Sequence, residues 1–111
     1  MRDGTKTYEG TEVKYRVWIH IDGFDMSSDD FDITIANSNG TQRVFQKSDL
    51  VERPIIEDGE VKTAYYLCFD TSEFGPGSLV AIVRAYVPDQ DFPDGHRTVI
   101  DKLDLVNVRC L

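Results

Sequence analysis

The chain has few of the residues on which metal-binding, disulfide-rich and nucleic-acid-binding proteins depend. It contains two cysteines and two histidines in 111 residues, too few for a disulfide framework and too scattered in sequence for a zinc site. Its 12 Lys and Arg residues are outnumbered by 20 Asp and Glu residues, which gives a net charge of −8. Because a nucleic-acid binder needs a basic surface to displace counterions, this charge excludes nucleic acid as a partner. An acidic surface favours solubility, cations and basic partners instead.

Catalytic motifs and long apolar runs are missing as well. There is no Gly-x-Ser-x-Gly elbow, no glycine-rich phosphate loop leading into a helix and no histidine pair at metal-ligand spacing. The many carboxylates lie in acidic loops, where the composition alone accounts for them. No apolar run approaches the length of a bilayer span. We therefore expect a protein that is not an enzyme, has no cofactor and does not insert directly into a membrane.

What the chain does have is alternation of apolar and polar residues, with the period of two that is typical of half-buried β-strands. Turn residues separate these runs, and Asn37–Gly40 and Asp58–Gly59 are typical of tight hairpin turns because Asn and Gly tolerate positive φ. About seven strands in a chain of this length predict an all-β fold, an immunoglobulin-like antiparallel β-sandwich. The Cys–Trp–Cys core of antibody domains is absent, because Trp18 precedes both cysteines. The predicted strands cover residues 12–21, 31–36, 41–47, 55–56, 60–69, 78–87 and 96–109.

Three of these strands carry further information. Segment 78–87 is apolar on both faces, which predicts a central strand. Pro54 precedes the short strand 55–56 and marks it as a sheet edge. In the last strand the apolar phase changes between Leu105 and Val106, which predicts a β-bulge.

The first eleven residues differ from the rest of the chain. Residues 1–11 are polar and predict a flexible leader, and residues 12–111 then form a single domain. The leader lacks the apolar core of a signal peptide. The compartment therefore stays open: the cytoplasm, or the cell envelope or exterior if a targeting segment has been removed.

An acidic loop over residues 88–95 contains the first candidate cation ligands. Asp89, Asp91 and Asp94 lie beside Gly95, and Ca²⁺ takes roughly six to eight oxygen ligands in loops of this kind. The spacing is not that of an EF-hand. We therefore favour a solvated turn in which the aspartates cap their own backbone.

A second acidic cluster follows the first predicted strand. If every strand reverses the direction of the one before, this cluster lies at the same end of the sandwich as Asp70 and Glu73, and at the opposite end from loop 88–95. The sequence thus predicts two separate acidic regions. The second cluster consists of Asp22, Asp25, Asp29 and Asp30.

Aromatic side chains in the outward phase of the strands form the first candidate interaction surface. Trp18 lies in this phase with Arg16 and His20, and Tyr66 and Tyr86 can join it. An exposed aromatic strip suits recognition of a sugar or of another protein. The alternative is that it packs against the leader or against cross-strand neighbours.

The C-terminal half of the last strand is the second candidate surface. Leu105, Val106 and Val108 make it apolar with little charge, and an open edge there would accept a strand from a partner or from a second copy. The alternative is a fully paired strand. Cys110 is almost terminal and Cys68 lies in the outward phase of its strand, so we expect two free thiols.

Two segments of the second half of the chain resemble known proteins. Residues 69–77 (FDTSEFGPG) and 86–95 (YVPDQDFPDG) are similar to segments of small proteins carried on mobile elements of gut bacteria, namely conjugative transposons and prophages. The resemblance extends over about residues 12–108 and is most specific at turn 88–95. It implies an accessory or surface-assembly role and supplies no catalytic residue.

Together these features predict a non-enzymatic β-sandwich module that mediates protein–protein contact in a surface or particle assembly, with the partner and the oligomeric state left open. One alternative is a carbohydrate-binding module with an aromatic platform and a Ca²⁺-holding acidic loop, which an exposed aromatic strip would favour. Another is a hydrolase, which would need two loop carboxylates about 5–10 Å apart in a cleft.

Overall fold

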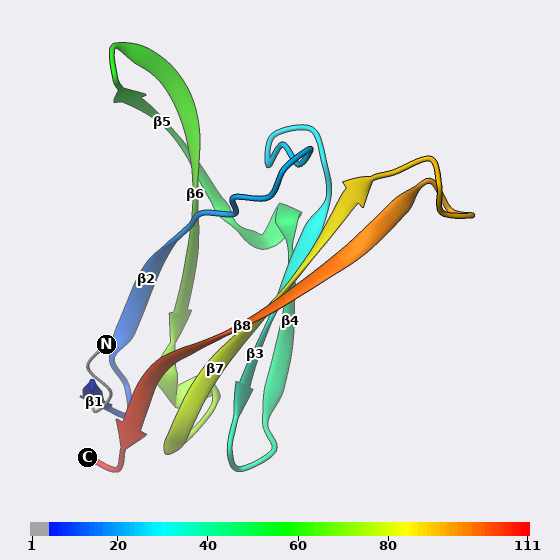
Figure 1. Cartoon of the computed structure of the whole chain (residues 1–111). Helices are drawn as coiled ribbons and strands as arrows, with labels where there is room; N and C mark the ends of the chain where they lie inside the picture. The colour runs from blue at the N-terminus through cyan, green and yellow to red at the C-terminus, as the bar shows by residue number, and fades with distance from the viewer. Residues whose placement is uncertain (1–4) are drawn as a thin grey trace.

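The computed structural model describes residues 5–111, and within them the chain is all β apart from two short 3₁₀-helices (Figure 1). These helices, η1 and η2, cover Lys47–Asp49 and Thr71–Glu73. The strands are β1 (Lys6–Tyr8), β2 (Glu12–Val17), β3 (Phe31–Asn37), β4 (Gln42–Gln46), β5 (Val51–Glu57), β6 (Glu60–Asp70), β7 (Gly77–Pro88) and β8 (His96–Arg109).

The strands form two sheets that pack face to face as a β-sandwich, which confirms the predicted architecture (Figure 1). The larger sheet has the order β1-β8-β7-β3-β4, and the smaller sheet has the order β2-β6-β5. The pairing of β1 with β8 is parallel, and the other pairs are antiparallel. The immunoglobulin-like order is not confirmed: β3 lies between β7 and β4, whereas in immunoglobulin domains the equivalents of β3 and β6 share a sheet.

The core lies between the facing sides of the two sheets. Phe31 and Ile35 of β3 are fully buried, and Leu79 of β7 is nearly so. Phe69 of β6 meets Phe74 edge-on, with 5.2 Å between the ring centroids. Full burial of each such side chain stabilises the fold by about 1.5–3 kcal/mol. The alternation seen in the sequence therefore supplies the core from both sheets.

Three predictions about individual strands are confirmed. β7 is central, between β8 and β3, and β5 is an edge strand. β8 contains the expected bulge: Ser78 pairs with Asn107 and Val80 pairs with Asp104, so β8 has one residue more than β7 over this interval. The bulge explains the change of apolar phase in the last strand.

The predicted flexible leader needs a correction. Residues 1–4 lie outside the described residues, but Lys6–Tyr8 form β1 and pair in parallel with Asn107–Arg109 of β8. Two further hydrogen bonds extend this pairing: Asn107 N donates to Thr5 O at 3.0 Å, and Glu9 N donates to Arg109 O at 2.9 Å. Backbone hydrogen bonds thus order a polar segment that has no apolar pattern of its own.

The predicted placement of the acidic loops is wrong. β4 and β5 run in the same direction, because η1 carries the chain from the larger sheet to the smaller one without reversing it (Figure 1). The loop after β2 therefore lies at the same end as the loop after β7, and Tyr86 N donates to Asp30 O at 3.0 Å. Asp70 and Glu73 lie at the opposite end, where Glu73 pairs with Arg43 at 2.6 Å.

The two ends of the sandwich are named as they stand in Figure 1. The upper end contains loops 18–30 and 89–95, and the lower end contains turns 38–41 and 71–76. Asn37 holds the lower end together. Its buried side-chain Nδ2 lies 2.8, 2.9 and 3.1 Å from the carbonyl oxygens of Phe74, Gly75 and Pro76. Gly77 follows with φ +136°, and a Cβ there would collide with Asn37 Oδ1.

Candidate functional site

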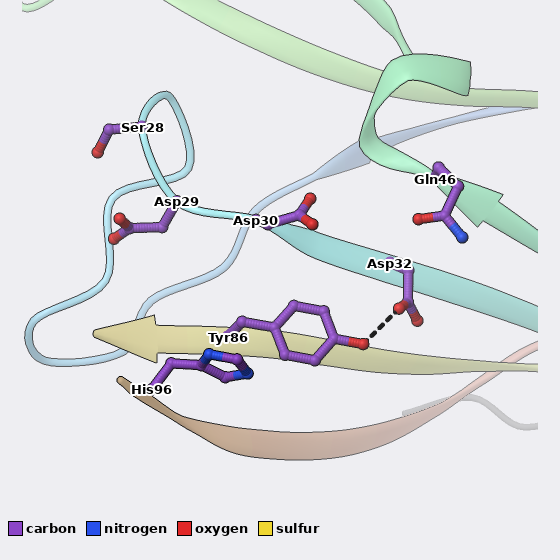
Figure 2. A pocket seen from close by; sticks show the side chains of 7 residues that line it. All are labelled: Ser28, Asp29, Asp30, Asp32, Gln46, Tyr86 and His96. Carbon is purple, nitrogen blue, oxygen red and sulfur yellow. Dashed lines mark hydrogen bonds between the residues drawn. The ribbon is translucent and has the colours of Figure 1, made fainter. Parts of the chain in front are cut away.

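An acidic recess opens at the upper end (Figure 2). It lies where β3 and β8 begin and where β4 and β7 end, and its volume is about 560 Å³. The recess brings part of the second acidic cluster together with Tyr86, which the sequence assigned to a different surface. The lining residues are Ser28, Asp29, Asp30, Asp32, Gln46, Tyr86 and His96.

Tyr86 and Asp32 meet on the outer face of the larger sheet. The phenol Oη donates to Asp32 Oδ2 at 2.6 Å (Figure 2). Ionisation of the phenol would lose this hydrogen bond and place two negative charges together, so the bond to Asp32 raises the pKa of Tyr86. Arg84 Nη1 lies 3.8 Å from Asp32 Oδ1. Asp32 is therefore engaged by a phenol and a guanidinium.

The loop carboxylates of the recess are occupied by the chain's own backbone. Asp30 Oδ1 accepts from Phe31 N at 2.9 Å, and Asp29 Oδ2 accepts from Asp25 N at 2.8 Å. Asp25 in turn accepts from the hydroxyl and the N–H of Ser27, and these hydrogen bonds, the hydroxyl first, lower the pKa of Asp25. The recess thus presents a negative surface made of turn-capping groups.

Loop 88–95 is built in the same way. Asp89 Oδ1 accepts from Asp91 N at 3.0 Å, and Asp89 Oδ2 lies 3.3 Å from Arg97 Nε. Asp94 lies 3.4 Å from His96 Nε2. Across residues 5–111 no cluster of three or more His, Cys, Asp or Glu side chains is arranged to hold a metal ion. The favoured interpretation of this loop, a self-capped turn, agrees with the contact of Asp89 with Asp91.

The predicted aromatic surface is divided between the two sheets. Trp18 and Tyr66 lie on the outer face of the smaller sheet, since Arg16 is in register with Tyr66 and its guanidinium lies 4.3 Å above the Trp18 ring. Tyr86 belongs to the other sheet. Trp18 is 53% exposed, but His20 stacks on it at 5.2 Å with 9° between the planes. Arg16 and His20 thus already contact the Trp18 ring, and a sugar stacking on the ring would compete with them for part of it.

The predicted C-terminal surface is largely internal. Val106 and Val108 are buried, and Leu105 is half-buried and packs against the core. The backbone of Val108 pairs with Thr7 of β1, so this part of the edge is already covered. The open part of the same edge lies further up the strand.

The free edge of β8, residues 96–106, has no strand beside it on the side away from β7 within the described chain. Two large apolar side chains on this stretch remain in water: Ile100 is 60% exposed and Leu103 is 49% exposed. They lie on opposite faces of the strand, because Ile100 pairs with Arg84 and Leu103 pairs with Ala81. An added strand would cover both.

An apolar groove runs beside this free edge. β2 and β8 belong to different sheets, and the core opens between them in a groove of about 230 Å³. We call it the β2–β8 groove. Its floor and walls are mainly apolar, with Arg16 as the charged member. They include Tyr15, Val17, Trp18, Ile19, Ile33, Leu67, Val83, Leu103 and Leu105.

Sequence reasoning missed Ile100 and Leu103 as surface residues. The alternation around them predicts a strand, but it does not say which side of that strand has a neighbour. The sequence does show a long last strand, 14 residues in the structure, but the 3-residue partner β1 that leaves most of it uncovered is seen only in the structure. Cys68 and Cys110 are both free and exposed, in agreement with the prediction.

Comparison with known proteins adds no relative, since no family model, no curated protein sequence and no solved structure matches the chain. Among residues 5–111, no helix combines the length and the apolarity that crossing a membrane requires. The functional argument therefore depends on the geometry of the sandwich alone.

Proposed function

We propose that the protein is a non-enzymatic protein-binding β-sandwich that takes up an extended segment of a partner along the free edge of β8. The single observation that carries this proposal is the position of that edge beside the β2–β8 groove. In strand addition, main-chain hydrogen bonds supply affinity, and pockets for alternate side chains supply specificity. Residues 96–106 offer the hydrogen-bonding edge, and the groove offers the pocket.

The other sheet edges are less suited to this role. β5 contains Pro54, which lacks a backbone N–H and interrupts pairing. β4 is five residues long. β2 presents Lys14 and Arg16, and charged side chains of this kind discourage edge-to-edge pairing. The free edge of β8 instead exposes Ile100 and Leu103.

The resemblance to proteins of mobile elements supports this proposal, because it implies a role in a surface or particle assembly. An accessory protein of a surface or particle assembly needs a contact surface and no catalytic centre. A domain that accepts a strand meets that need, since strand addition joins two chains through their backbones.

A carbohydrate-binding module is the second candidate, because Trp18 is exposed. The stacking of Arg16 and His20 on its ring weakens this alternative. Trp18 is the only tryptophan, so its fluorescence reports directly on the site. A saturable change of that fluorescence with a soluble oligosaccharide would favour the sugar.

Site-specific crosslinking in the producing cells tests the proposed function. A photoreactive amino acid at Ile100, on the free edge, should form a crosslink to another polypeptide on illumination. The same group at Lys62 of β6, in the other sheet, is the matched control and should form none. No crosslink at position 100, or equal crosslinking at both positions, would contradict the proposal.

A further inference from the structure

The groove face of the free edge of β8 carries an unbalanced negative charge. Asp101 pairs with Val83 in the core-facing phase of β7, so it lies on the same face as Leu103. Asp101 is exposed and makes no ion pair with another residue of the described chain. Lys102 and Asp104 both lie on the outer face, where their opposite charges balance. The charge that remains is that of Asp101, two residues from an exposed leucine.

Neighbouring basic groups are already engaged elsewhere. Arg97, at the start of the edge, lies 3.3 Å from Asp89. Arg16, on the opposite wall of the β2–β8 groove, lies 3.2 Å from Glu57 and stacks on the Trp18 ring. Neither is paired with Asp101. A basic side chain arriving with a partner would meet a carboxylate that no described cation neutralises.

We infer that the strand that adds to the free edge of β8 is an extended, basic segment of a partner protein, with an apolar side chain opposite Leu103 and a Lys or Arg opposite Asp101. This inference rests on the proposed function and adds the chemistry of the partner. Opposite charges facing each other across two strands attract, and like charges repel. The net charge of −8 also repels an acidic segment and a second copy of this chain.

β1 supports this choice through continuity of the edge. It pairs with residues 107–109 and so shows that the same side of β8 accepts a strand. An added segment would continue that pairing along residues 96–106. Its side chains would alternate between the groove face and the outer face, which places residues two apart beside Asp101 and Leu103.

Peptide titration tests the inference. The probe is a short end-blocked peptide with the repeat Lys-Thr-Val-Thr, which places a lysine and a valine two residues apart on one face of an added strand, and its counterpart has glutamate in place of lysine. We expect saturable shifts of the backbone amide resonances of residues 96–106 with the lysine peptide and none with the glutamate peptide. Asp101→Lys should weaken binding of the lysine peptide by about tenfold, because an attraction across the strands becomes a repulsion.

Glu60→Lys is the matched control, since it makes the same change of net charge at the first residue of β6, in the other sheet. It should weaken binding by less than about threefold. Equal weakening by both variants, or preference for the glutamate peptide, would overturn the inference. Concentration-dependent broadening of the same amides without peptide would overturn it by identifying a second copy as the occupant.

The proposed function and this inference can fail separately. If position 100 crosslinks to a partner but the lysine peptide does not bind, the basic segment is wrong and the binding edge stands. If neither experiment gives a signal, both proposals are wrong.

Discussion

The lower and upper parts of β8 differ although they belong to one strand. In the lower part, Val108 is buried, its backbone pairs with β1, and its partner across β7 is Gly77, next to the Asn37 network. In the upper part, residues 96–106 lack an outer neighbour among the described residues, and Ile100 and Leu103 are in water. The lower part has a buried side chain and strands on both of its edges. The upper part leaves the backbone groups of one edge unpaired and two apolar side chains exposed to water. If the proposed strand addition is correct, stability and contact belong to opposite parts of the same strand.

Replacing Asn37 should have the largest effect on stability. Asn37→Ala removes a buried side chain that donates to three carbonyl oxygens of turn 74–76 and leaves Gly75 O without a side-chain donor, so we expect the free energy of unfolding to fall by about 2–4 kcal/mol. Asn39 also donates to Phe74 O, at 3.0 Å, but is exposed, so Asn39→Ala is the control and should cost about 1 kcal/mol or less. Urea denaturation measures both. Equal losses would mean that burial of Asn37 does not decide the stability of the lower end.

The two parts of β8 can be compared directly by truncating one apolar side chain in each. Val108→Ala creates a cavity in the core and should lower the free energy of unfolding by about 1–3 kcal/mol. Ile100→Ala removes a side chain that is 60% exposed and should change it by less than about 0.5 kcal/mol. Thermal or urea denaturation of the two variants gives the comparison. If Ile100→Ala lowers the free energy of unfolding as much as Val108→Ala does, the upper part of β8 contributes to stability as much as the lower part.

Most of the strands follow from the sequence, but their arrangement follows only in part. Alternation predicted seven of the eight strands, Pro54 marked the edge strand, and the phase change in the last strand marked the bulge. β1 could not be predicted, because it is ordered by backbone pairing with a strand 101 residues away in the chain (Lys6 with Asn107). The direction of β5 could not be predicted either. Whether a short 3₁₀ turn reverses the chain or moves it to another sheet depends on tertiary packing.

The candidate site was harder to predict than the fold for the same reason. The sequence identified the last strand as an edge, but it placed the open part at Leu105–Val108, where the structure has buried side chains and β1. Trp18 was correctly assigned to the outward phase. The acidic loops were placed at opposite ends because strict alternation of direction was assumed. Local pattern gives the faces of a strand, and only the assembled sheets show which edges remain open.

At the upper end, the pair Tyr86–Asp32 should show a smaller, pH-dependent effect. Tyr86→Phe should lower the free energy of unfolding at pH 7 by about 1.5 kcal/mol, the lower end of the range for a hydrogen bond to a charged group, because this bond is only partly buried. The pKa of Tyr86 is raised in the folded state above 10.0. Its contribution is therefore complete below about pH 10 and is lost as the pH rises through the folded pKa, so wild type and variant should converge there.

Absorbance titration of tyrosinate provides the corresponding check on the cause. Asp32→Asn removes the carboxylate that faces the phenol, so Tyr86 should ionise at lower pH in this variant than in the wild type. Arg84→Gln, which leaves the Tyr86–Asp32 hydrogen bond in place, should not lower the pKa of Tyr86. An unchanged titration in Asp32→Asn would show that burial, rather than the hydrogen bond, sets this pKa.

The parallel pairing of β1 with β8 has a mechanical consequence. Tension applied to the chain before β1 and after β8 would pull the two strands in opposite directions along their common axis. The hydrogen bonds from Asn107 N to Thr5 O and from Glu9 N to Arg109 O would then be strained together, in shear, instead of opening one after another as at the end of a hairpin. A short strand that adds little buried surface would thus resist stretching of the chain, and the free edge of β8 above it would keep its shape while the domain is under tension.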